Sequence, residues 1–171
     1  MKTILLCSDL DRTLIPNGAQ PESPQARPAL FRLAGHQAFR LAYVSGRDQD
    51  LVREAIADYR LPEPDFVIGD VGATLYHVER KQWRMNEAWW QEIGKDWHGL
   101  EHDDINAMLS TVKDVELELQ PPEKQSKYKI SYYTDPSVDA DKFKERISDI
   151  FLDHKVAASI EGVFAQQEAQ A

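Results

Sequence analysis

Little in this 171-residue sequence favours a secreted, membrane-bound or nucleic-acid-binding protein. Its single cysteine, Cys7, excludes a disulfide framework and a cluster of thiolate metal ligands. No apolar run approaches the roughly 20 residues that cross a bilayer, and residues 1–7 are too short for the apolar core of a signal peptide. The net charge of −9, from 20 basic and 29 acidic residues, disfavours binding to nucleic acids or anionic membranes. These absences predict a cytoplasmic protein.

The first 70 residues alternate between predicted strands and predicted helices. Short apolar runs predict buried strands at residues 4–7, 39–44 and 66–68. Ser23 and Pro24 are the residue types of a helix N-cap and a first helical position, and an amphipathic helix is predicted over residues 48–59. Because strands and helices alternate, we expect a parallel sheet with right-handed crossovers.

The pattern changes after residue 70. A hairpin is predicted from residues 74–78 and 81–84 around Glu79-Arg80, and Asn86 is of a type that caps a helix. Further helices are predicted at residues 105–109 and 143–151, and further strands at residues 115–119, 128–133 and 156–160. We therefore expect a core of residues 1–78, a separate α+β unit of residues 79–160, and a frayed tail of residues 161–171.

Two carboxylates follow the first predicted strand, at Asp9 and Asp11. Ligands of open α/β sheets bind at the carboxyl ends of the strands, and residues two apart in an extended chain point to the same side. Paired acids in such a place can hold Mg²⁺ through their oxygens. One of them can also act as a nucleophile while the other transfers protons. A single aspartate would more often begin a turn or cap a helix.

The second predicted strand ends at Ser45-Gly46-Arg47, before a predicted helix. A hydroxyl, a glycine that leaves backbone N–H groups accessible, and a helix N-terminus form an anion site, and Arg47 adds a bidentate phosphate contact. Ser-Gly is also a common turn. An anion site is favoured because the strands at 4–7 and 39–44 are expected to be neighbours. Asp9 and Asp11 would then face the Ser45-Gly46-Arg47 loop.

Together these residues resemble the haloacid-dehalogenase superfamily of aspartate-nucleophile phosphohydrolases, and within it the sucrose-phosphate phosphatase family. Residues 9–14 look like the first motif of the superfamily and residues 44–47 like its second. Residues 61–72 and 127–133 resemble a third-strand segment and a cap strand of the family. The resemblance covers nearly the whole chain. It implies an α/β fold with a partial Rossmann-like parallel-sheet core and an inserted α+β cap that selects the substrate.

The resemblance also implies a mechanism. Asp9 would attack phosphorus and become an aspartyl phosphate, while Asp11 would protonate the leaving sugar oxygen and then activate water. Mg²⁺ would be held by the Asp9 carboxylate and the Asp11 backbone carbonyl. Ser45 and the Gly46 amide would hold phosphoryl oxygens, and Thr13 would orient the Asp9 loop. The implied substrate is a sugar phosphate resembling sucrose 6-phosphate.

The sequence departs from the family pattern in two places. Arg12 stands in a tight loop where the superfamily usually has glycine. The lysine and the acid pair that the family carries after its cap are not found, since Gly69-Asp70 comes too early and Gly162 is the only glycine beyond residue 100. We therefore expect a truncated phosphatase, because each lost charge partner costs ~10²–10³ in rate. Missing core strands would also leave a sheet edge open to self-association.

Three more residues are candidates for substrate contacts. Gln125 and Lys129 lie in the predicted cap and suit sugar hydroxyls or phosphate, and Asp70 ends the third strand, where it could line the cleft. The plainer interpretation makes Lys129 a solvated edge-strand charge and Asp70 a turn residue.

Three other functions use parts of the same pattern. A non-catalytic module that binds sugar phosphate or a partner enzyme is compatible with the missing later motifs, but it has little use for a nucleophile. A phospho-receiver domain also places acids after its first strand, but it lacks an inserted α+β unit. Phosphotransferase or mutase activity would use the same residues. The leading hypothesis remains a Mg²⁺-dependent sugar-phosphate phosphatase.

Overall fold

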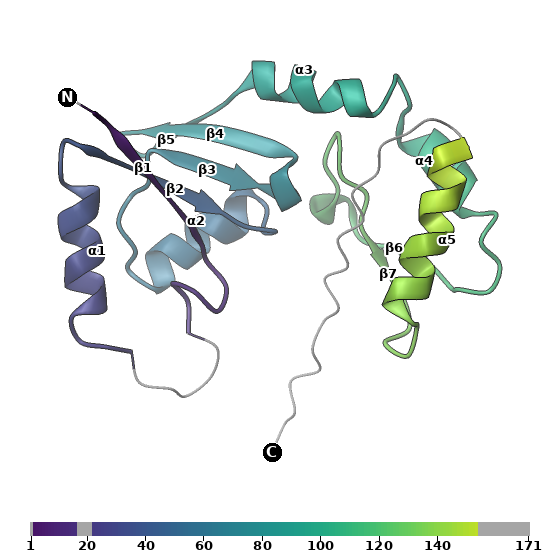
Figure 1. Cartoon of the computed structure of the whole chain (residues 1–171), viewed down its shortest axis with the longest axis horizontal. Helices are drawn as coiled ribbons and strands as arrows, with labels where there is room; N and C mark the ends of the chain where they lie inside the picture. Colours follow the sequence, from purple (N-terminus) through teal and green to yellow (C-terminus); the bar gives the residue numbers. More distant parts are fainter. Residues whose placement is uncertain (1, 17–21, 154–171) are drawn as a thin grey trace. The chain divides into compact units, whose positions relative to one another are not determined.

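The computed structural model describes residues 2–16 and 22–153, and the predicted strand at 156–160 and the tail at 161–171 lie outside that range. The chain forms two compact units, one up to Gln91 and the other from Glu92 onward (Figure 1). The boundary falls within helix α3 (Glu87–Asp96). The first unit thus extends beyond residue 78, and the division into core and cap stays a prediction.

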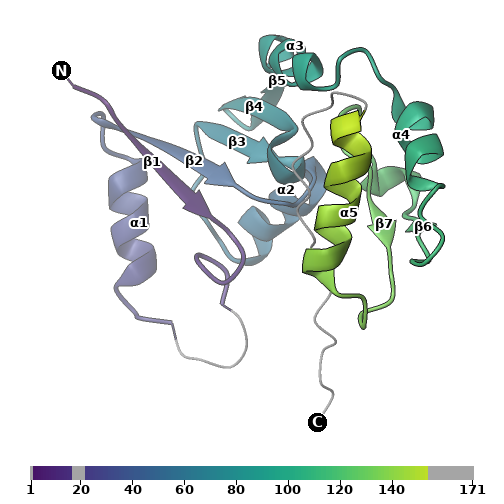
Figure 2. The ribbon, with the colours of Figure 1, turned by 45° about the vertical axis from the view of Figure 1, so that its right-hand side comes forward.

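The first unit is built on a five-stranded sheet with the order β1-β2-β3-β4-β5 (Figure 2). Its strands are β1 (Ile4–Asp9), β2 (Phe39–Val44), β3 (Phe66–Gly69), β4 (Thr74–Glu79) and β5 (Gln82–Met85). The first three are parallel, as predicted, and β4 and β5 are antiparallel additions. The predicted hairpin is therefore confirmed, but it completes the sheet of the first unit, and its turn is Arg80-Lys81.

Two helices connect the parallel strands. Helix α2 (Gln49–Asp58) lies where a helix was predicted. The Asp48 side chain caps its N-terminus by accepting a hydrogen bond from the Leu51 N–H. Helix α1 (Ala26–Ala34) begins later than Ser23 and Pro24 predict, with Gln25 at the N-cap and no side-chain cap. None of the residues of α1 is buried.

The core of the first unit lies between the sheet and α2. Leu41, Tyr43 and Val67 from the central strands pack with Val52 and Ala55 of α2. The buried Tyr43 hydroxyl donates a 2.8 Å hydrogen bond to the Pro62 carbonyl, which satisfies its polar end. This core fixes β2 and β3, and with them the loops at their carboxyl ends.

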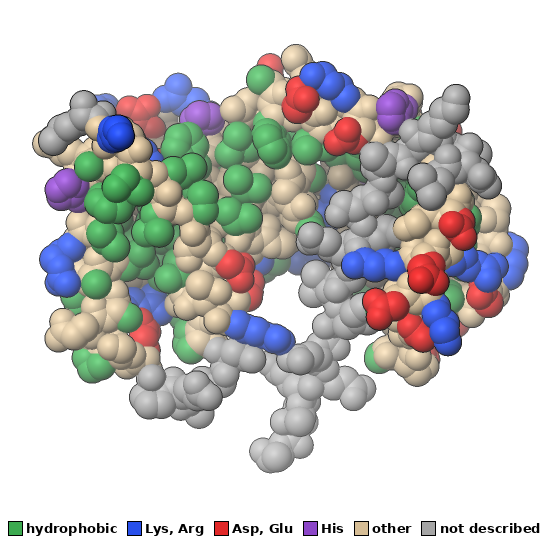
Figure 3. Space-filling model, in the orientation of Figure 1, with side chains coloured by type: hydrophobic (Ala, Val, Ile, Leu, Met, Phe, Trp, Pro, Cys, Tyr) green, Lys and Arg blue, Asp and Glu red, His purple; other side chains and the backbone are tan. Residues whose placement is uncertain are grey.

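The prediction that residues 4–7 form a buried strand is wrong in one respect. They form β1, but Ile4 is 52% exposed and Leu5 56% exposed. β1 is at the edge of the sheet, where no strand among the described residues pairs with its outer side, and its side chains are less covered than those of the central strands, such as Tyr43 and Val67. Hydrophobic side chains accordingly gather on the face of the first unit seen in Figure 3. An uncovered apolar edge strand is an unusual feature that natural proteins normally protect.

The second unit contains helix α4 (His102–Leu109), strands β6 (Glu118–Leu119) and β7 (Tyr132–Tyr133), and helix α5 (Ala140–Asp153). Its core is formed by Ile105 and Leu109 from α4 with Ile147 and Phe151 from α5. The helices agree with their predicted positions. The strands predicted at 115–119 and 128–133 shrink to two residues each. The start of the second lies in a turn, because Ser126 and Lys129 bond to each other in a bridge.

No helix among the described residues combines the length and the apolar character that crossing a membrane requires.

Candidate active site

The carboxyl ends of the parallel strands bring three of the predicted site residues to one edge of the sheet. Asp9 is the last residue of β1 and pairs in register with Val44 at the end of β2, so that Ser45 follows directly beside it. The Ser45 N–H donates a 2.9 Å hydrogen bond to the Ile68 carbonyl of β3, one residue before the strand ends. Asp70 follows β3 at the same edge. The parallel topology thus places these residues as neighbours.

A tight loop holds the exposed Asp9 carboxylate. The Leu10 N–H donates to Asp9 Oδ1 at 2.7 Å, whereas Thr13 Oγ1 lies 3.4 Å from Oδ2. The Leu10 carbonyl accepts from the N–H groups of Thr13, Leu14 and Ile15, and the buried Leu10 side chain anchors the loop in the core. One carboxylate oxygen is therefore fixed by the backbone, and the other is held only weakly.

Arg12 in this loop has a φ of 61°. This left-handed conformation is the one that glycine adopts without cost, and other residues adopt it at a cost of ~1–2 kcal/mol. The departure from glycine noted in the sequence thus coincides with backbone strain beside the candidate nucleophile.

Asp11 is paired with Arg47. Arg47 Nε lies 2.9 Å from Asp11 Oδ2, and Arg47 Nη2 lies 2.6 Å from Asp11 Oδ1. This bidentate hydrogen bonding lowers the pKa of Asp11 below its ordinary value, although partial burial opposes the shift. The same bond raises the pKa of Arg47. Both residues are partly exposed, with side-chain exposures of 50% for Asp11 and 29% for Arg47, so the pair remains open to exchange with a ligand.

The Ser45-Gly46-Arg47 loop lies between the ends of β1 and β3. Ser45 is 5% exposed, and its hydroxyl accepts a 3.2 Å hydrogen bond from the Arg47 N–H. The predicted anion site also used the N-terminus of the next helix, but the Asp48 carboxylate caps that end of α2. The anion-binding capacity of this loop therefore rests on its own amides, the Ser45 hydroxyl and the Arg47 guanidinium.

The turn after β3 is a feature that sequence reasoning missed. Asp70, Val71 and Gly72 have φ values of 51°, 58° and 97°. The Asp70 N–H donates to the Arg47 carbonyl at 2.9 Å, and the buried Asp70 carboxylate accepts from the Thr74 hydroxyl at 3.2 Å. Asp70 therefore supports the Arg47 loop through its backbone. Gly72 gave a signal for left-handed backbone and Asp70 a weaker one, whereas Val71 gave none.

The other two predicted substrate residues lie in the second unit. The Gln125 side chain donates to the Gln120 and Ser131 carbonyls and accepts from the Ser131 N–H, at 2.7, 3.0 and 2.7 Å. Both amide donors of Gln125 are thus used to hold the chain segment together, which leaves acceptor capacity for a sugar hydroxyl. Lys129 is half-buried in the turn at residues 126–129.

A magnesium site was predicted at Asp9 and Asp11. Within residues 2–16 and 22–153, no group of three or more His, Cys, Asp or Glu side chains is arranged to hold a metal ion. Mg²⁺, however, is commonly held by one or two protein carboxylates, with substrate phosphate and water completing its shell. The Asp9 carboxylate and the Asp11 backbone carbonyl are hard oxygen donors of that kind, so these residues fit such an ion.

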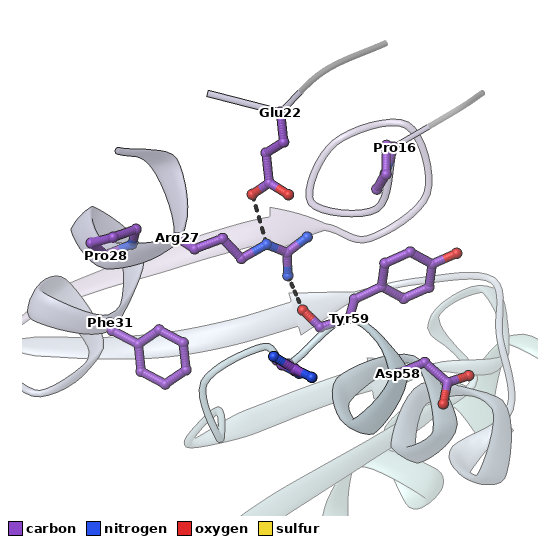
Figure 4. A pocket seen from close by; sticks show the side chains of 8 residues that line it. Pro16, Glu22, Arg27, Pro28, Phe31, Asp58 and Tyr59 are labelled. Atoms are coloured by element: carbon purple, nitrogen blue, oxygen red, sulfur yellow. Dashed lines mark hydrogen bonds and ion pairs between the residues drawn. The ribbon is translucent and has the colours of Figure 1, made fainter. Parts of the chain in front are cut away.

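A cavity of about 700 Å³ lies elsewhere in the first unit, between α1 and the end of α2 (Figure 4). Arg27 extends across it, binding Glu22 through Nε and the Tyr59 and Leu14 carbonyls through its other nitrogens. None of the predicted site residues lines the cavity. Because the Arg27 guanidinium is satisfied by these partners, its evident role is to tie three segments together.

Comparison with known proteins connects this site to a family. The sequence profile of the family "Sucrose-6F-phosphate phosphohydrolase" matches residues 2–167. A protein of Nitrosococcus oceani named as HAD-like hydrolase is 52% identical over 136 residues, which are 80% of this chain and 36% of that protein. Glucosylglycerol-phosphate synthase of Pseudomonas anguilliseptica is 42% identical over 80 residues, which are 46% of this chain and 10% of that protein.

Solved structures of similar fold include a member of the same class of enzymes. The sucrose-phosphatase of Synechocystis sp. PCC6803, in complex with sucrose and phosphate, is similar with a TM-score of 0.69 and 27% identity, over 90% of this chain and 58% of that one. The haloacid dehalogenase-like protein yhjK of Bacillus subtilis shares the fold, with a TM-score of 0.57 and 14% identity over 86% of this chain and 55% of that one. The chain thus spans little more than half of these structures. It belongs to the sucrose-6F-phosphate phosphohydrolase family of HAD-like hydrolases.

Proposed function

We propose that this chain acts as a Mg²⁺-dependent sugar-phosphate phosphatase that uses Asp9 as its nucleophile. The observation that carries the proposal is the position of the Asp9 carboxylate. It ends β1, next to the Ser45 loop that follows β2, so a phosphoryl group held by the Ser45 hydroxyl and the Gly46 amide would lie beside it. Family membership supports the same class of chemistry.

Of the two Asp9 oxygens, Oδ2 is the better nucleophile. Oδ1 accepts a 2.7 Å hydrogen bond from the Leu10 N–H, while Oδ2 has only a 3.4 Å contact with Thr13. Oδ2 would form a bond to phosphorus as the bond from phosphorus to the sugar oxygen breaks, giving an aspartyl phosphate. Water would then attack phosphorus and regenerate the Asp9 carboxylate.

Asp11 would serve as the general acid and base. In its acid form it would give its proton to the leaving sugar oxygen, and it would later take a proton from the attacking water. The Arg47 pair opposes the first step, because it lowers the pKa of Asp11 and favours the carboxylate. Transfer of Arg47 from Asp11 to the phosphoryl oxygens would remove this obstacle and provide the phosphate contact predicted for Arg47.

Magnesium, where bound by the Asp9 carboxylate and the Asp11 carbonyl, would offset the negative charges of the carboxylate and the phosphoryl group. Thr13 would keep the Asp9 loop in place through its contact with Oδ2.

The proposed substrate is a phosphorylated sugar resembling sucrose 6-phosphate. Supporting it are the similarity to a sucrose-phosphatase solved with sucrose and phosphate and the family match. Asp70, Gln125 and Lys129 remain proposed substrate residues. Self-association through the exposed edge of β1 is a further part of the proposal, since Ile4 and Leu5 are more than half exposed there.

A second candidate is a binder of sugar phosphates without turnover. The Asp11–Arg47 pair favours it, because a carboxylate with both oxygens held by a guanidinium is a poor proton donor.

Phosphate release from sucrose 6-phosphate with Mg²⁺ separates the two candidates. The hydrolase proposal expects release by the folded chain and none above background by Asp9→Asn. Equal release by both chains, or saturable binding of sucrose 6-phosphate with no release, would contradict the hydrolase proposal. The second of these results would support the binder.

A further inference from the structure

The loop between β3 and β4 has positive φ values that a hairpin loop of its length does not require. Gly69 pairs with Thr74, so residues 70–73 form a four-residue hairpin loop. Such loops are most often built around a type I turn, whose central residues have negative φ. Here the loop begins with positive φ at Asp70, Val71 and Gly72, and Val71 is β-branched, the type of residue that resists this conformation most.

Three other non-glycine residues with positive φ have local reasons. Arg80 and Lys81 form the two-residue turn of the β4–β5 hairpin, where positive φ matches the twist of the strands. Arg60 follows the C-cap residue of α2, where left-handed residues commonly end helices. Asp70 and Val71 lie instead beside the candidate active site, as left-handed Arg12 does, and strain at such sites is commonly retained for function.

The strained backbone presents the Val71 side chain to the Ser45-Gly46-Arg47 loop. A Cβ built on Gly46 would lie 3.9 Å from Val71 Cγ2, which is ordinary contact distance. The Asp70 N–H is bonded to the Arg47 carbonyl, so the two loops are fixed to each other. Val71 is nevertheless 40% exposed, and it therefore offers an apolar surface next to the expected phosphate position.

We propose that Val71 is a specificity-determining residue that contacts the sugar of the substrate and not its phosphate. This inference rests on the proposed phosphatase site. A sugar ring presents C–H groups that pack against an aliphatic side chain, and Val71 lies next to the Gly46 amide proposed to hold the phosphoryl group. The strain is retained because glycine or asparagine, which adopt this backbone more easily, would lack that surface.

The test compares two ligands in the Asp9→Asn background, where turnover is blocked. Binding of sucrose 6-phosphate and of inorganic phosphate is measured by calorimetry with Mg²⁺, for the background chain and with Val71→Gly or Val71→Asn added. We expect sucrose 6-phosphate to bind about 5- to 10-fold more weakly with either substitution, a loss of about 1.0–1.4 kcal/mol. Inorganic phosphate should bind equally to all these chains.

Lys81→Gly is the matched control, because it places glycine at another left-handed position, away from this loop. It should change neither affinity. Equal weakening of both ligands by Val71→Gly would overturn the inference, since it would mean that the substitution moves the phosphate loop. Unchanged affinity for sucrose 6-phosphate, or no saturable binding of it by the background chain, would also overturn it. If the parent chain, which has Asp9, releases no phosphate from sucrose 6-phosphate, that result contradicts the hydrolase proposal and leaves the role of Val71 in binding untouched.

Discussion

Breaking the Asp11–Arg47 pair should have a small effect on folding that depends on pH. Two hydrogen bonds, at 2.9 and 2.6 Å, join the guanidinium to both carboxylate oxygens. A bidentate pair is stronger than a single contact, but the Asp11 side chain is 50% exposed and the Arg47 side chain 29% exposed, so water screens the charges. We therefore expect the pair to stabilise the fold by ~0.5–1 kcal/mol.

A double-mutant cycle isolates this coupling. The free energy of unfolding in urea is measured for the parent chain, Asp11→Ala, Arg47→Ala and the double variant, at about pH 7. The Arg84–Glu79 pair on the β4–β5 hairpin is the matched control, because its side chains are 69% and 66% exposed. That pair should couple by only a few tenths of a kcal/mol. A coupling of zero between Asp11 and Arg47 would show that the pair does not stabilise the fold.

The pH dependence has a definite sign. Because Arg47 lowers the pKa of folded Asp11 below the ordinary value of 3.8, the stabilisation is present above that value. It is lost as the pH falls through the folded-state pKa, where Asp11 becomes protonated. The coupling should therefore stay constant from about pH 7 to pH 5 and shrink only in more acidic solution. A coupling that grows as the pH falls would contradict this assignment.

Three further predictions concern the support of the site. Gly69→Ala should destabilise the chain by ~1–3 kcal/mol in urea unfolding, because its Cβ would lie 3.0 Å from the Arg47 carbonyl oxygen and 3.1 Å from Thr74 Oγ1. Gly35→Ala, whose nearest contact is 3.4 Å, should cost far less. Tyr43→Phe should cost ~1–2 kcal/mol by leaving the Pro62 carbonyl unpaired. Burial raises the pKa of Tyr43 above its ordinary value of 10.0, so in a pH titration the parent chain should lose stability above about pH 10, and Tyr43→Phe should lose less.

The sequence was sufficient for the elements whose pattern is local. Helix α2 begins at its Asp48 cap, and β2 has the predicted bounds, because each carries its own start and stop signals. The exposure of β1 could not be predicted in this way, since a short apolar run has the same composition at the centre of a sheet as at its edge. The strand predicted at 128–133 is confirmed only at Tyr132–Tyr133, because the turn at Ser126–Lys129 takes up the start of the predicted segment.

Some features of the candidate site could be predicted from the sequence and others could not. The carboxyl-edge rule for parallel strands correctly indicated that Asp9 and Ser45 would be neighbours. The rule does not specify side-chain partners, so the Asp11–Arg47 pair, 36 residues apart in sequence, was not foreseen. Nor was the left-handed Val71, because a valine in a turn normally indicates negative φ.

The role of Asp9 as nucleophile is tested by looking for a phosphoryl group on its side chain. The chain is mixed with sucrose 6-phosphate and Mg²⁺, quenched in acid within a turnover, and the peptide containing residues 9–14 is analysed by mass spectrometry. We expect a phosphoryl adduct on Asp9 that appears before free phosphate accumulates and is lost as turnover proceeds. Asp9→Asn should show neither adduct nor release. Phosphate release without an adduct on Asp9, or undiminished release by Asp9→Asn, would contradict the assignment of Asp9 as the nucleophile.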